Sequence, residues 1–116
     1  MKTYIYHNPR WSKSRESVKI LNENNVDYKI VNYIKEGLSK TDLLIICKFL
    51  DIKPIDIIRT SDQYYKDLEI STEDMKKDEF LLDVILKNPT VLQRPIFING
   101  DKAIIGRPPE RVLDIL

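Results

Sequence analysis

The fold of this chain is decided by Thr3-Tyr4-Ile5-Tyr6-His7-Asn8-Pro9-Arg10-Trp11-Ser12-Lys13-Ser14-Arg15. A short β-branched and aromatic run opens the stretch, and a helical pattern leaves it at Ser12. A strand–loop–helix junction directs backbone N–H groups and the positive end of a helix dipole at one spot. Because Arg10, Lys13 and Arg15 add positive charge there, the loop indicates an anion-binding site.

The loop also permits a plainer interpretation. His7-Asn8-Pro9 is typical of a turn, and the basic residues equally suit a solvated helix start. His7, Ser12 and Ser14 would supply further donors to an anion, whereas Trp11 stands where a reactive loop carries its nucleophile. The residues alone leave both interpretations open.

A strand–helix–strand unit surrounds the loop. Ser12 to Asn24 has Val18 and Leu21 on its apolar side and predicts a helix, and Val26 to Tyr33 alternates as a strand does. Two strands joined by a helix within about 30 residues form a right-handed unit with parallel strands.

The middle of the chain predicts helices. Ser39-x-x-Asp42 has a capping-box pattern ahead of an apolar stripe that includes Cys47. Further helical segments are predicted at Pro54–Ile58, Asp62–Leu68 and Glu73–Lys87, the last of them capped by Thr72 and stopped at Asn88-Pro89.

A β-hairpin and a helix close the chain. Pro95–Ile98 and Ala103–Ile105 flank Asn99-Gly100, a strong hairpin signal, and Glu110–Leu116 predicts a final helix. A βαβ unit followed by ββα around one mixed sheet is the thioredoxin-like α/β arrangement.

Composition bounds the function. Of 116 residues, 19 are basic and 18 acidic, a balance that argues against a nucleic-acid binder. No apolar run approaches the roughly 20 residues of a membrane span, and no signal peptide is evident. We therefore expect one cytoplasmic domain over residues 1–116, a monomer with neither a membrane nor a nucleic-acid partner and no bound metal.

The single cysteine, Cys47, cannot form an internal disulfide, which suits a reducing compartment. It lies on the stripe made by Leu43, Ile46 and Leu50, where a free cysteine behaves as a small hydrophobe. We expect it to be unreactive core.

Three arginines lie at the ends of regular elements: Arg59, Arg94 and Arg107. A guanidinium fork suits a tetrahedral oxyanion, and several can share one anion, here with no carboxylate predicted among them. The spacing alone favours the alternative of unconnected surface ion pairs.

Together these stretches resemble the arsenate reductase family of the glutaredoxin-coupled type, whose wider group includes Spx-like transcription regulators. Tyr6–Arg15 is similar to the family's His-Asn-Pro-x-Cys-x-x-Ser-Arg signature. Further segments are similar in the same order along almost the whole chain: Ile58-Arg59-Thr60, Tyr65–Leu68, Asn88-Pro89, Gln93–Ile96, Asn99–Ala103 and Ile105–Glu110. The last of these favours the arsenate reductase branch.

The resemblance implies a thioredoxin-like fold with a helical insertion at about 39–87. It implies a mechanism in which a cysteine thiolate at the head of the first helix attacks arsenate, glutathione displaces the product and glutaredoxin recycles the mixed disulfide. His7 matches the histidine beside the nucleophile, and Pro95 matches the family's cis-proline. The matched oxyanion-binding residues are Ser14, Arg15, Arg59, Arg94 and Arg107.

Trp11 departs from the pattern, since it stands where the family's catalytic cysteine stands. Indole has one N–H donor and no nucleophilic lone pair. We therefore expect an oxyanion-binding member of the family, for arsenate, phosphate or sulfate, with no bound cofactor and no thiol-dependent reduction. Glutathione and glutaredoxin would be partners only of an intact reductase.

Two alternatives stay open. One is an Spx-like regulatory or protein-interaction module that needs no cysteine. The other is an active reductase whose cysteine is absent only from this form of the sequence.

Overall fold

The protein is described here by a computed structural model in which residues 3–116 are placed. Two compact units make up the chain. The sheet unit combines the residues up to Glu36 with Arg94–Leu116, and the helical unit is Gly37–Gln93.

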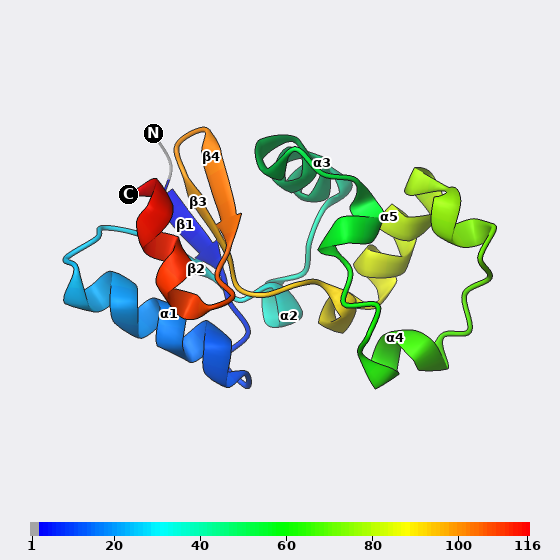
Figure 1. Cartoon of the computed structure of the whole chain (residues 1–116), viewed down its shortest axis with the longest axis horizontal. Coiled ribbons are helices and arrows are strands. Elements are labelled where there is room, and N and C mark those ends of the chain that lie inside the picture. The colour runs from blue at the N-terminus through cyan, green and yellow to red at the C-terminus, as the bar shows by residue number, and fades with distance from the viewer. Residues whose placement is uncertain (1–2) are drawn as a thin grey trace. The chain divides into compact units, whose positions relative to one another are not determined.

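The sheet unit contains one four-stranded mixed sheet in the order β2-β1-β3-β4 (Figure 1). Its strands are β1 (Thr3–Tyr6), β2 (Lys29–Val31), β3 (Ile96–Asn99) and β4 (Lys102–Ile105). β1 pairs in parallel with β2 and antiparallel with β3, which pairs antiparallel with β4. The predicted parallel pair, hairpin and mixed sheet are confirmed, and so is the thioredoxin-like α/β fold.

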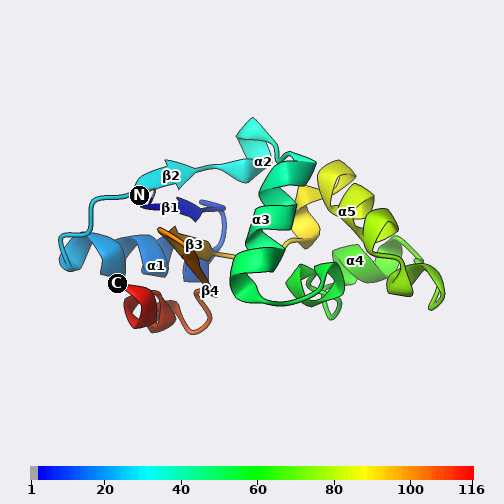
Figure 2. The ribbon, with the colours of Figure 1, turned by 90° about the horizontal axis from the view of Figure 1, so that it is seen from above.

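Two helical segments cover one face of this sheet (Figure 2), namely α1 (Ser12–Glu23) and the 3₁₀ helix η4 (Pro109–Ile115). They share a core with the sheet because each contributes apolar side chains to the same buried cluster. That cluster consists of Ile5, Leu21, Phe97, Ile104 and Val112. It fixes the second half of α1 against β1, β3 and β4.

One sequence expectation in this unit was wrong in detail. The strand predicted over 26–33 pairs only at Lys29–Val31, because Tyr33 already begins a short helix, α2 (Tyr33–Glu36). Val26 and Tyr28 instead pack against the core cluster, where the Tyr28 hydroxyl lies 2.6 Å from Asn22 Oδ1. The predicted final helix is present as the 3₁₀ helix η4.

The helical unit contains two principal helices, α3 (Lys40–Leu50) and α5 (Asp78–Lys87). The predicted capping box of α3 is confirmed: Ser39 Oγ accepts from Asp42 N, and Asp42 Oδ2 accepts from Ser39 N, both at 3.0 Å. Shorter segments complete the unit: η1 (Pro54–Ile57), α4 (Gln63–Asp67), η2 (Asp74–Lys76) and η3 (Pro89–Val91).

The long helix predicted over 73–87 was wrong at its start. A 3₁₀ turn, η2, comes first, and the extended backbone of Lys77 separates it from α5. Ser71, and not Thr72, accepts the hydrogen bond of Asp74 N. Two capping signals one residue apart compete here, and the chain uses the first.

Cys47 is buried on α3, as predicted. Burial, followed by the charges of Asp78 and Asp56, raises the pKa of its thiol. Among residues 3–116, no helix is long and apolar enough to cross a membrane.

Candidate functional site

The candidate site is the loop that carries the chain from β1 into α1. His7 N donates to Val31 O at 2.9 Å and so continues the pairing of β1 with β2. Asn8 then closes the turn, since its carbonyl accepts from Trp11 N at 3.1 Å and its side chain accepts from Arg10 N at 3.1 Å. The loop is therefore held by its own hydrogen bonds.

A buried polar cluster lies beneath the loop. His7 Nδ1 is 2.6 Å from Ser14 Oγ, and Ser14 Oγ also accepts from Asn8 N at 3.1 Å. All three residues are buried, and Ser14 is completely so. Ser14 Oγ accepts a hydrogen bond from Asn8 N, and its own hydroxyl proton is available for donation to His7 Nδ1.

This arrangement favours a neutral His7 with its proton on Nε2. Desolvation by burial, followed by the charge of Arg15, lowers the pKa of His7 below its usual 6.5. A neutral imidazole can accept the Ser14 proton, whereas an imidazolium cannot. The geometry and the direction of the pKa shift therefore agree.

Two of the matched oxyanion residues are engaged within the loop. Ser14 is completely buried and its hydroxyl is hydrogen-bonded to both His7 and Asn8, so it holds the loop in place. Arg15 Nη1 donates to Pro9 O at 2.8 Å and leaves its guanidinium on the exposed side.

Trp11 is the N-cap residue of α1. Its backbone is extended, and its side chain makes no capping hydrogen bond to the helix. The first turn of α1 contains no acidic residue, so the positive end of the helix dipole is not compensated there.

Arg94 lies directly against Trp11. Its guanidinium carbon is 3.7 Å from the centre of the indole ring, which is the geometry of a cation–π contact. Arg94 is only 2% exposed, whereas Trp11 is 38% exposed. The tryptophan thus covers the charge of Arg94, which the family resemblance had matched to an oxyanion-binding arginine.

Pro95 follows Arg94 through a cis peptide bond at the entry to β3. Arg107 is exposed just beyond β4, and its bond to Pro108 is also cis, which the sequence had not indicated. The sheet unit thus contains His7, Trp11, Ser14, Arg15, Arg94, Pro95 and Arg107.

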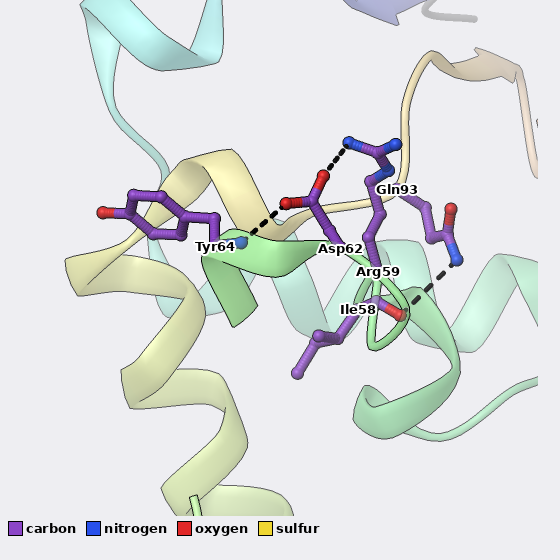
Figure 3. A network of polar contacts seen from close by, with 5 residues as sticks. All are labelled: Ile58, Arg59, Asp62, Tyr64 and Gln93. Carbon is purple, nitrogen blue, oxygen red and sulfur yellow. Dashed lines mark hydrogen bonds and ion pairs between the residues drawn. The ribbon is translucent and has the colours of Figure 1, made fainter. Parts of the chain in front are cut away.

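Arg59 belongs to the helical unit and has a carboxylate partner (Figure 3). Its Nη1 lies 2.8 Å from Asp62 Oδ2, and both side chains are largely buried. Asp62 also caps α4 by accepting from Tyr64 N at 2.8 Å, and Gln93 Nε2 contacts Ile58 O at 3.4 Å. The expectation that no carboxylate accompanies the three arginines was therefore wrong for Arg59.

Sequence reasoning missed Asn8 and Asp62 as organising residues. Both could have been found from the sequence. The Asn-Pro dipeptide is a turn signal, and Asp62 is a preferred capping residue that stands before a helix start and three residues after Arg59. Among the described residues, no cluster of three or more His, Cys, Asp and Glu side chains suits a metal ion.

Comparison with known proteins agrees with this loop and fold. The sequence model of the ArsC family matches residues 6–115. The chain is 42% identical to an arsenate reductase of Haemophilus influenzae over 117 residues, covering 100% of both chains. It is 33% identical to an arsenate reductase of Neisseria meningitidis, covering 97% of this chain and 96% of that protein. The solved structure of an arsenate reductase from Vibrio cholerae superposes with a TM-score of 0.90 at 31% identity, covering 100% of this chain and 98% of that one.

Proposed function

Because this chain belongs to the ArsC family, we propose that it binds a tetrahedral oxyanion at the β1–α1 loop but does not reduce it by thiol chemistry. One observation carries the proposal: Trp11 occupies the head of α1, where the family signature has its cysteine. The anion is arsenate, phosphate or sulfate, which share their shape and charge.

The binding half of the proposal rests on charge placed around the start of α1. Arg10, Lys13 and Arg15 are exposed on the loop and first turn, and the first turn holds no acidic residue. Glu16, just after that turn, lies 3.8 Å from Lys13 and offsets part of the charge. The first N–H groups of any α-helix lack partners within that helix, and an anion satisfies them. Arg94 supplies a further fixed charge behind the loop, at the entry to β3.

The chemical half rests on the absence of a competent nucleophile among the loop residues. The Trp11 indole cannot attack an oxyanion, and the hydroxyl of Ser14 is buried and directed at His7. Cys47 lies in the helical unit, and its raised thiol pKa disfavours the reactive thiolate. Without a thiolate no mixed disulfide forms, so glutathione and glutaredoxin have no step to perform in the parent protein.

The decisive experiment compares the parent protein with Trp11→Cys. We expect the parent to show no arsenate reduction above background in the presence of glutathione and glutaredoxin. In Trp11→Cys the new thiol would lie at the positive end of α1 beside Arg94, which lowers a thiol pKa. We therefore expect this variant to be alkylated by iodoacetamide much faster than Cys47 and to gain glutathione-dependent turnover.

A matched control removes the remaining thiol. Cys47→Ser in the parent should leave activity at background, and Trp11→Cys/Cys47→Ser should behave as Trp11→Cys does. Parent turnover that disappears in Cys47→Ser would contradict the proposal, because it would assign the thiol chemistry to Cys47.

A further inference from the structure

Arg94 combines full charge with almost complete burial. Its side chain is 2% exposed, and the indole of Trp11 lies over its guanidinium at 3.7 Å. A dissolved anion cannot form hydrogen bonds with a guanidinium that water does not reach. Part of what covers Arg94 must move before Arg94 can contribute to binding.

We propose that Trp11 is a lid over Arg94 that an incoming oxyanion displaces. The inference rests on the proposed anion site at the β1–α1 loop and adds its regulation. In the closed form the aromatic face screens the guanidinium, and in the open form the charge is presented to the anion.

The hydrogen bonds of Asn8 and Arg15 that hold the loop do not involve the indole of Trp11. Trp11 makes no side-chain capping bond to α1, so rotating it does not undo the helix end. Its outer side is in contact with solvent, since 38% of the residue is exposed.

The lid makes anion binding weaker than the charges alone would allow. A site that is open only part of the time shows an affinity reduced in proportion to its open fraction. The indole and the anion compete for one guanidinium, so the strength of the cation–π contact sets the closed fraction. The strength of cation–π contacts, from exposed to partly desolvated ones, corresponds to an anion affinity reduced roughly 2- to 30-fold.

The test uses the fact that Trp11 is the only tryptophan of the chain. Sodium sulfate is titrated into the parent protein at constant ionic strength, with sodium chloride removed in compensation. We expect the tryptophan emission to shift to longer wavelength as the indole leaves Arg94 for water. Half of this shift should occur at the sulfate concentration that gives half-saturation by calorimetry.

Two variants and a control complete the test. Trp11→Ala should bind sulfate roughly 2- to 30-fold more tightly than the parent. Trp11→Phe keeps a ring with a weaker cation–π contact and should fall between the two. Arg111→Ala, an exposed change in η4, should leave both the emission shift and the affinity unchanged.

The remaining outcomes contradict either the lid alone or both the lid and the anion site. If sulfate binds but the emission does not change and Trp11→Ala has the parent's affinity, the lid is wrong and the anion site stands. Weaker binding by Trp11→Ala would also overturn the lid, because it would make the indole a contact of the anion. If neither the parent nor Trp11→Ala binds sulfate, both the lid and the proposed function are wrong.

Discussion

At the scale of single residues, His7 is the side chain whose surroundings say most about the loop. It is the only histidine of the chain, it is buried, and its Nδ1 faces a hydroxyl that another donor already occupies. Protonation of His7 would make Nδ1 a donor, and the Ser14 hydroxyl would then have to turn its own proton away and accept a second hydrogen bond. The arrangement in the structure therefore favours a neutral imidazole.

The lowered pKa of His7 predicts how the stability of the protein changes with pH. The pKa of His7 is lowered in the folded protein, so the unfolded chain takes up its proton first as the pH falls below about 6.5. The His7 contribution to the free energy of unfolding should be complete above that pH and should decline on acidification toward the folded pKa. Urea denaturation at several pH values between about 7.5 and 5 measures how the free energy of unfolding changes with pH.

His7→Asn is the matched variant, since it removes the titrating group but keeps a polar side chain. Its stability should depend less on pH in this window, where carboxylates account for the remaining slope. An NMR titration of the imidazole should give a midpoint below about 6.5. An identical slope in parent and variant, or a midpoint above that value, would disagree with a neutral buried His7.

At the scale of elements, Gly106 shows how closely α1 and the end of β4 are packed. A Cβ placed there would lie 2.8 Å from Ser17 Oγ on α1, 2.9 Å from Pro95 Cγ and 3.3 Å from Val112 Cγ1. These distances are shorter than ordinary contacts, so the glycine is needed for space. The close packing also holds Pro95, and with it the residue before it, at one position.

Gly106→Ala should therefore destabilise the protein by about 1–3 kcal/mol, as overpacking of a core does. The midpoint of urea denaturation should fall while its slope stays the same. Ser17 tests the cause, because its completely buried Oγ has no hydrogen-bond partner among the described residues. Adding Ser17→Ala should recover part of the loss, and strictly additive effects would show that Ser17 is not the obstacle.

At the scale of the whole molecule, a balanced net charge conceals an uneven distribution. The chain carries a formal net charge of +1, yet the stretch from His7 to Arg15 contains basic residues and no acidic one. Basic side chains are therefore concentrated on one loop of the sheet unit, next to Glu16, which lies 3.8 Å from Lys13. Exposed charges are screened over about 10 Å at 0.1 M salt, so comparisons of anions require a constant ionic strength.

A bound oxyanion should stabilise the fold by mass action. At a concentration about 100 times its dissociation constant, the gain in unfolding free energy would be roughly 2.7 kcal/mol. Sulfate, phosphate or arsenate should accordingly raise the melting temperature more than chloride does, as measured by differential scanning calorimetry. Arg107→Ala should reduce the anion-specific rise, and Arg111→Ala should not. If sulfate, phosphate and arsenate raise the melting temperature of the parent protein no more than chloride does, the result would contradict the proposed anion site.

The sequence by itself determined the features that rest on local patterns. Alternation and helical spacing placed β1, α1 and α3, Asn99-Gly100 placed the hairpin, and Ser39 with Asp42 placed a helix start. The resemblance on the His7–Arg15 signature was enough to identify the family and to single out Trp11. Each of these signals lies within a few residues, where propensity and hydrogen bonding act directly.

Only the tertiary structure decided what depends on neighbours distant in the chain. The start of α2 at Tyr33 limited the length of β2, and the folding of β3 beside β1 brought Arg94 under the ring of Trp11. The role of Ser14 was likewise hidden, because a serine in a signature does not reveal which side of the loop its hydroxyl faces. Long-range contacts are set by burial and by the geometry of the whole sheet unit, which no local pattern encodes.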